Sequence, residues 1–156
     1  WCINRIASFY GFWIFLTITL FKKMIKKEII KLASSTSNVG LKNKYTHKIS
    51  LKNTTCGDQI ILELIADKKK ISSMKYETVS CVYCEASASL LSRKIKNIKL
   101  KDIKNDFITL KNVSIQKKGK IPKKLSDFKK LINSDNFNRF KCIFLPIDAV
   151  LKALKL

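Results

Sequence analysis

The sequence has few of the residues on which several common classes of active site depend. Its 156 residues include one histidine, four glycines and two prolines. It contains no glycine-rich phosphate loop and no His-Glu-x-x-His motif, and His47 is the only histidine from which a Ser-His-Asp triad could be built. The 11 acidic residues are scattered along the chain, so a hydrolase with paired carboxylates is not indicated.

Arginine is also scarce, although the chain is strongly basic. The net charge is +21, yet Arg5, Arg93 and Arg139 are the only arginines. Proteins that bind nucleic acid rely on arginine for bidentate contacts with bases and phosphates, and here the lysines are scattered without interleaved aromatic residues. We therefore interpret the lysines as a solvated surface and expect no nucleic-acid partner. An acidic protein partner is the alternative.

The first 23 residues differ in character from the rest. Residues 6–21 carry no charge, but 16 residues are fewer than the roughly 20 that a transmembrane helix needs. No small-residue cleavage site follows this run, as a signal peptide would require. We expect residues 1–23 to be an apolar extension outside the working protein. A membrane anchor is the alternative, and membrane contact is expected only if this segment is genuine.

The pattern from Met24 onward predicts one α+β domain, residues 24–156. An amphipathic helix starts near Met24 and ends before Gly40. Alternating or β-branched segments then predict three antiparallel strands, at 45–51, 59–66 and 70–79. Further helices are expected at 86–95, 100–107, 124–132 and 145–154, with a loop at 111–124 and Pro146 in the first turn of the last helix. We expect a small three-stranded sheet with the helices packed on one face.

The five cysteines are the most informative residues: Cys2, Cys56, Cys81, Cys84 and Cys142. Without signs of secretory processing we expect a cytoplasmic protein whose thiols are reduced, and hence ligands or nucleophiles rather than disulfides. A single cysteine is more often just a small buried residue. Three of these, however, are expected at turns or helix starts, where the helix dipole favours the thiolate.

Three segments of the sequence carry a family resemblance. Cys56-Gly57-Asp58 precedes a predicted strand, Cys81 lies five residues before an Ala-Ser-x-Ser helix start at Ala86, and Cys142 precedes the last predicted helix. In this order and spacing, the segments resemble the U-type iron-sulfur cluster scaffold family, which contains NifU, IscU and SufU. The arrangement is most similar to the SufU and NifU branches, because Lys141 stands where the IscU branch has a histidine.

The resemblance implies a ligand set and a function. Cys56, Asp58, Cys81 and Cys142 would hold an iron-sulfur cluster (2Fe-2S) or zinc. Asp58 would supply an oxygen ligand that binds iron less firmly than thiolate does and so favours release. We expect a scaffold that assembles a cluster and passes it to recipient apo-proteins. The alternative is a zinc-dependent sulfurtransferase that accepts persulfide sulfur from a cysteine desulfurase, with Cys142 as the acceptor.

Other residues have simpler interpretations. Without the neighbouring cysteines, Asp58 would be interpreted as a turn residue. Cys84 is either a small buried residue or a spare ligand or sulfur carrier, and no second Cys-x-x-Cys pair completes a zinc site with it. His47 is expected to be a surface or packed residue rather than a ligand. Cys2 is assigned no role.

Overall fold

A three-stranded antiparallel sheet forms one side of the molecule. The computed structural model describes residues 27–156, apart from the side chain of Asn97. Strands β1 (His47–Lys52), β2 (Gln59–Ala66) and β3 (Ile71–Val79) lie in the order β1-β2-β3. Lys52 pairs with Gln59 and Gln59 pairs with Val79. The end of β1, the start of β2 and the end of β3 therefore meet at one edge of the sheet.

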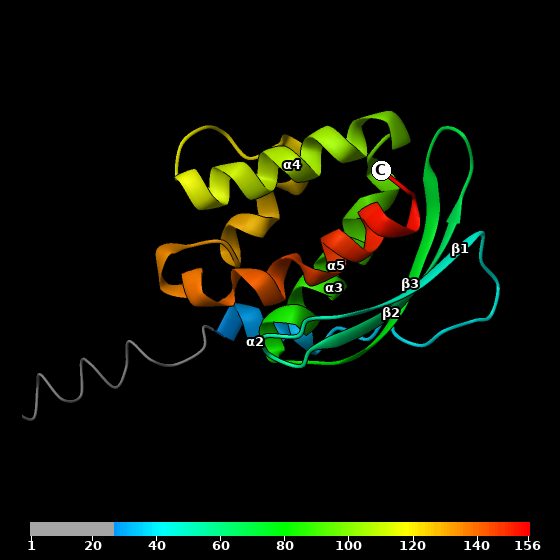
Figure 1. The fold of residues 1–156 in the computed structure, drawn as a ribbon, viewed down its shortest axis with the longest axis horizontal. Helices are drawn as coiled ribbons and strands as arrows, with labels where there is room; N and C mark the ends of the chain where they lie inside the picture. The colour runs from blue at the N-terminus through cyan, green and yellow to red at the C-terminus, as the bar shows by residue number, and fades with distance from the viewer. Residues whose placement is uncertain (1–26) are drawn as a thin grey trace, which may run out of the picture.

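The helices cover one face of this sheet (Figure 1). Helices α3 (Val82–Lys94) and α5 (Phe140–Ala153) lie side by side between the sheet and the outer helix α4 (Leu100–Gln116). Helix α2 (Lys27–Ala33) packs against α3. Three short 3-10 helices complete the order: η1 (Ile95–Asn97), η2 (Lys123–Lys130) and η3 (Ser134–Arg139).

Alternating apolar residues on the strands build the core. Ile60, Leu62 and Leu64 on β2 are fully buried, as are Met74 and Tyr76 on β3. Burying each aliphatic side chain of this size contributes about 1.5–3 kcal/mol. Because residues two apart on a strand point to the same face, this pattern sets which face the helices cover.

The predicted fold class is confirmed, but several element boundaries were wrong. The predicted strand 59–66 is observed with the same bounds, and the other two strands differ by one or two residues at their ends. The predicted loop at 111–124 is confirmed only for residues 117–122, because α4 continues to Gln116 and η2 begins at Lys123. Apolar Ile103, Phe107, Leu110 and half-buried Val113 repeat at helical spacing there and pack inward, which outweighs the polar composition.

The helix expected at 145–154 begins five residues earlier, at Phe140. Pro146 therefore lies inside α5 rather than in its first turn, which corrects the prediction. Proline has no backbone N–H, so Pro146 cannot donate the usual helical hydrogen bond to the carbonyl of Cys142, four residues earlier. The early start is explained by Phe140, Ile143 and Phe144, which are buried and place this turn in the core.

The N-terminal extension predicted at residues 1–23 lies outside the described residues. Within residues 27–156, no helix combines the length and the apolar character needed to cross a membrane.

Candidate metal centre

The turn between β1 and β2 presents Cys56 and Asp58 at the edge of the sheet where all three strands meet. The backbone N–H of Asn53 donates to the Asp58 carbonyl over 2.8 Å, and the N–H of Gly57 donates to the Asn53 carbonyl over 2.8 Å. Gly57 has φ of +77°, a left-handed conformation that glycine adopts without strain. The Cys-Gly-Asp sequence therefore closes a tight turn that leaves Cys56 exposed.

Asp58 points inward from this turn and joins it to the start of α3. Its side chain is 5% exposed. Oδ1 accepts a hydrogen bond from the backbone N–H of Cys81 over 2.9 Å, and Oδ2 accepts one from the Cys81 thiol over 3.2 Å. Burial opposes ionisation of the carboxyl, but this N–H and the three surrounding thiols outweigh burial and hold the pKa of Asp58 below its ordinary value. Asp58 is thus an ionised carboxylate at neutral pH.

Cys81 occupies the N-cap position of α3, where its extended backbone precedes the first helical residue. Burial raises the pKa of the Cys81 thiol, and the hydrogen bond to Asp58 adds to this, although the N–H groups of Tyr83 and Cys84 act in the opposite direction. The expectation that the helix start makes this thiol acidic is therefore wrong, because burial and the neighbouring carboxylate outweigh the two N–H groups of the first turn.

Cys142 approaches the same place from the first turn of α5, rather than from just before the helix as predicted. Its thiol is 3.3 Å from the sulfur of Cys56, and both cysteines are free. Burial, followed by hydrogen bonds with Cys56 and Asp58, raises the pKa of the Cys142 thiol well above its ordinary value. Binding a cation here would require the thiols to release their protons.

The donor atoms of Cys56, Asp58 and Cys142 all lie within 4.8 Å of one another. Cys81 adjoins this group through Asp58. Four tetrahedral bonds to zinc, at about 2.3 Å to sulfur, place ligand sulfurs about 3.8 Å apart, so the spacing suits one ion after small adjustments. Three thiols and one carboxylate are also donors that zinc and iron accept. The structure thus brings together the four residues that the sequence predicts as ligands.

Cys84 and His47 do not belong to this group of donors. Cys84 is fully buried on the inner side of α3, and burial raises the pKa of its thiol to about 12. This agrees with its interpretation as a small packed residue. His47 begins β1, at the opposite end of the strand from the Cys56 turn, and its Nδ1 lies 2.8 Å from the Thr46 hydroxyl. The expected surface or packed role of His47 fits its half-buried position.

Several residues that support the site were missed by sequence reasoning. Glu85, one turn into α3, accepts hydrogen bonds from Tyr76 over 3.1 Å and from Thr78, and so ties the end of β3 to the helix that Cys81 begins. Ser87 donates to the carbonyl of Ile143 over 2.6 Å and fixes α3 against α5 beside Cys142. An acidic residue in the first turn of a helix was the available signal for Glu85.

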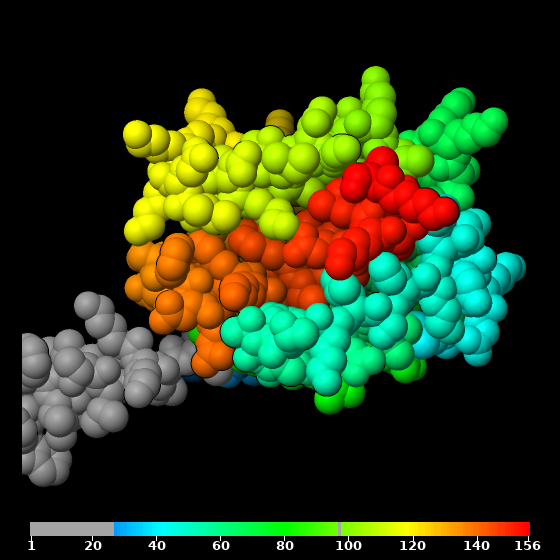
Figure 2. All heavy atoms as spheres, viewed as in Figure 1, coloured from blue at the N-terminus to red at the C-terminus, as the bar shows by residue number. Residues whose placement is uncertain are grey.

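The charges around the site are mainly positive. The Lys141 ammonium lies 3.4 Å from the Thr55 hydroxyl, so it spans the gap between α5 and the Cys56 turn. The guanidinium of Arg139 lies over the Tyr83 ring at 5.9 Å. In the space-filling view, the β1–β2 turn (cyan-green) lies against the start of α5 (orange) (Figure 2). Cations at this rim favour anionic ligands and partners.

Comparison with known proteins places this fold and these motifs in a family. A model of the family described as NifU-like N terminal domain matches residues 24–135, a range that contains Cys56, Asp58 and Cys81 and ends before Cys142. The chain is 28% identical over 139 residues to a protein of Thermotoga maritima named iron-sulfur cluster assembly scaffold protein IscU. That alignment covers 87% of this chain and 96% of the relative.

Two crystal structures share the fold. A nitrogen-fixing NifU-like protein (N-terminal) from Brucella abortus superposes with a TM-score of 0.76 at 15% identity, covering 83% of this chain and 91% of the other. A putative SufU scaffold protein from Fervidobacterium islandicum gives a TM-score of 0.76 at 21% identity, with coverage of 83% and 96%. The resemblance drawn from the cysteine motifs is confirmed: the chain belongs to the NifU-like N-terminal domain family of iron-sulfur cluster assembly scaffolds.

Proposed function

We propose that the domain at residues 24–156 assembles an iron-sulfur cluster on Cys56, Asp58, Cys81 and Cys142 and passes it to recipient apo-proteins. The observation that carries this proposal is the meeting of three thiols and one ionised carboxylate that come from three segments far apart in the sequence. Thiolates are the usual protein ligands of such clusters. A single oxygen ligand makes one bond weaker, which suits a cluster that must leave.

Sulfur for the cluster would come from a cysteine desulfurase, and we propose Cys142 as the residue that receives it. The Cys142 thiolate would bond to the outer sulfur of the desulfurase persulfide while the persulfide S–S bond breaks. The desulfurase cysteine would leave as a thiolate and take the proton that Cys142 gives up. Cys142 is buried beside the exposed Cys56, so the structure around Cys142 must open before the desulfurase reaches it.

A second function is favoured by the compactness of the site. Three of the donor atoms lie within 4.8 Å of one another, a spacing that suits one tetrahedral ion better than the two irons of a 2Fe-2S cluster. The protein would then hold zinc and act as a sulfur acceptor for the desulfurase. In both cases we propose a cytoplasmic location, where thiols stay reduced.

The test is metal and sulfide analysis of the anaerobically purified protein, together with its visible absorption spectrum. Iron and sulfide with sulfur-to-iron charge-transfer absorbance, lost in Cys56→Ser and Cys142→Ser, would support the scaffold. Stoichiometric zinc without colour, together with stimulation of a desulfurase, would support sulfur transfer.

The matched control is Cys84→Ala, because Cys84 is a buried cysteine outside the donor group. It should retain the metal that the two serine variants lose. Both proposals fail if the unaltered protein binds neither iron nor zinc. They also fail if Cys84→Ala loses metal as completely as Cys142→Ser.

A further inference from the structure

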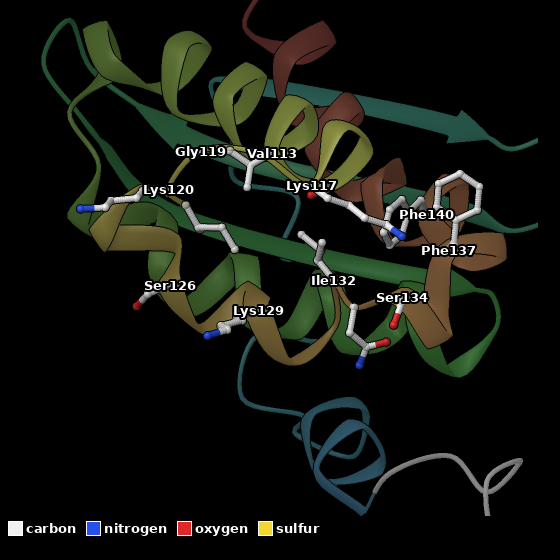
Figure 3. A pocket seen from close by; sticks show the side chains of 13 residues that line it. Val113, Lys117, Gly119, Lys120, Ser126, Lys129, Ile132, Ser134, Phe137 and Phe140 are labelled. Atoms are coloured by element: carbon white, nitrogen blue, oxygen red, sulfur yellow. The ribbon is translucent and has the colours of Figure 1, made fainter.

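A hollow lined by none of the four proposed ligand residues lies between the end of α4 and the segments η2 and η3. It has a volume of about 700 Å³ and is open on one side. Figure 3 shows Val113 and Ile132 pointing into it from opposite walls, with Phe137 and Phe140 at one end. This volume lies in the range of pockets that bind small molecules.

The walls of this hollow are mostly apolar. Val113, Ile121, Ile132 and Phe140 line it, and Phe137 stands at its rim with 53% of its surface exposed. Burial of apolar surface contributes roughly 25 cal/mol per Å² to stability, and a half-exposed phenyl ring gains only part of this contribution. The hollow therefore offers apolar surface to an apolar ligand group.

The charged residues that line the hollow are all lysines. Lys117, Lys120 and Lys129 are among its lining residues, and none of the described lining residues is acidic. The nearby carboxylate of Asp127 is 2.6 Å from Lys94, on the other side of η2, and so is already paired. Figure 3 shows Lys117 extended across the hollow toward Phe137 and Phe140, whereas Lys120 points outward.

The loop after α4 holds Lys117 in this position. Lys117 has φ of +56° and its N–H donates to the Val113 carbonyl over 2.9 Å, which ends the helix. Gly119 follows with φ of +100°, and a Cβ there would lie 3.2 Å from a methyl carbon of Val113. The chain thus turns back closely over Val113. A lysine just after a helix also compensates the negative end of the helix dipole, but that role alone predicts no ligand.

We propose that this hollow binds a free small molecule that combines an apolar body with one anionic head group, such as a carboxylate, sulfonate or phosphate. The apolar body would lie between Val113 and Ile132, and the head group would bind the ammonium of Lys117. Lys129 would contribute longer-range attraction. Binding requires no metal at the cysteine site, because no ligand residue of that site lines the hollow.

The test uses two fluorescent probes of similar shape, one anionic and one neutral. The anionic probe is 8-anilinonaphthalene-1-sulfonate and its neutral counterpart is N-phenyl-1-naphthylamine, both titrated into the full chain. We expect saturable one-to-one binding of the sulfonate and binding of the neutral probe that is roughly tenfold weaker, a loss equivalent to about 1.4 kcal/mol. Amide resonances of Val113, Lys117 and Phe137 should shift on binding in two-dimensional NMR spectra.

The variants separate charge from shape. Lys117→Glu should weaken binding of the sulfonate about tenfold or more, equivalent to about 1.4 kcal/mol. Lys104→Glu is the matched control, because Lys104 is an exposed lysine on α4 and does not line the hollow. It should leave the affinity unchanged. Val113→Trp should fill the hollow and reduce binding of both probes, with circular dichroism used to check that the variant is folded.

Three outcomes would overturn the proposal. The first is equal affinity for the two probes, and the second is an affinity for the sulfonate that Lys117→Glu leaves unchanged. The third is an NMR result in which the sulfonate shifts amides elsewhere in the chain. The same conclusion would follow if the amides of the hollow shifted only with an acidic leucine-rich peptide or with phosphatidylglycerol vesicles. That result would assign the hollow to a protein or a membrane.

Discussion

At the residue scale, Asp58 is the residue that we propose as the oxygen ligand through which a bound cluster is released. Its carboxylate lies among the three thiols and is ionised at neutral pH. An oxygen ligand bonds cluster iron less firmly than thiolate does, so under the proposed function exchange of the Asp58 ligand would let the cluster leave.

We therefore expect Asp58→Ala to slow the loss of the cluster to a chelator by roughly tenfold, or about 1.4 kcal/mol in the barrier. The measurement is the decay of charge-transfer absorbance after a chelator is added. Asp67→Ala is the control, because Asp67 accepts hydrogen bonds from Lys69 and Lys70 in a remote turn. Faster loss from Asp58→Ala than from the unaltered protein would show that Asp58 retains the cluster instead.

Glu63 leads to a prediction about pH and stability. It is 2% exposed, its Oε2 accepts from the N–H of Lys42 over 2.8 Å, and Oε1 lies 3.0 Å from the Lys48 ammonium. Burial opposes ionisation of the carboxyl, but Lys48 and the N–H groups of Lys42 and Asn43 outweigh it and lower the pKa of Glu63. A carboxyl whose pKa is lower in the folded than in the unfolded state stabilises the fold at pH values above its unfolded-state pKa. This stabilisation is lost as the pH falls through its folded-state pKa.

We expect Glu63→Gln to reduce the free energy of unfolding at pH 7. This deficit should shrink as the pH falls below 4.5, the ordinary value for glutamate. Urea unfolding followed by circular dichroism at several pH values measures it. Glu28→Gln, at an exposed glutamate on α2, should show no comparable deficit. A deficit for Glu63→Gln that is constant over this pH range would contradict the electrostatic explanation.

At the element scale, the turn between β1 and β2 depends on the left-handed conformation of Gly57. A Cβ at this position would meet nothing within 4 Å, so Gly57→Ala should cost only backbone strain, about 1 kcal/mol. Because Cys56 and Asp58 flank the residue, metal affinity should fall as well.

Gly40→Ala is a matched control for this variant. Gly40 has φ of +93° with no atom within 4 Å of the added Cβ, and its N–H donates to the Tyr76 carbonyl, away from the cysteine group. The two variants should lose similar stability in urea, but only Gly57→Ala should lose metal affinity by metal titration. Equal metal affinity of the two variants would show that the conformation of the β1–β2 turn does not affect metal binding.

The contact between α3 and α5 includes a buried hydrogen bond from Ser87 to the Ile143 carbonyl. Ser87→Ala should lower the free energy of unfolding by about 1 kcal/mol, since this bond joins two helices and its loss leaves a buried carbonyl less well satisfied. Ser114→Ala is the control, because that buried serine donates to Leu110 within its own helix. An equal effect of both changes in urea unfolding would contradict a role for Ser87 between the helices.

At the scale of the whole molecule, a metal would join the β1–β2 turn, the start of α3 and the start of α5. A ligand that binds the folded state alone stabilises it by about 2.7 kcal/mol at 100 times its dissociation constant. Zinc added to the protein should therefore raise the midpoint of thermal unfolding, and a chelator should reverse the rise. Cys142→Ser should abolish this shift, whereas Cys84→Ala should keep it. An identical shift in both variants would place the bound zinc elsewhere.

Much of this architecture could be predicted from local pattern. The strand 59–66 was predicted with its observed bounds, because its β-branched residues lie between clear turns. The boundaries of α4 and α5 were not predictable in this way. Apolar side chains such as Leu110 and Phe140 extend those helices by packing against other elements, and local composition does not report such contacts.

The sequence by itself determined which chemistry is available: three cysteines and an aspartate in motifs whose order and spacing indicate the family. The tertiary structure alone decided that their donor atoms meet, because β-sheet register aligns Lys52, Gln59 and Val79 at one edge and α5 packs back onto that edge. It also decided the direction in which the pKa of the Cys81 thiol moves, since burial and Asp58 outweigh the N–H groups of Tyr83 and Cys84. Both depend on contacts between residues far apart in the chain, which no local pattern encodes.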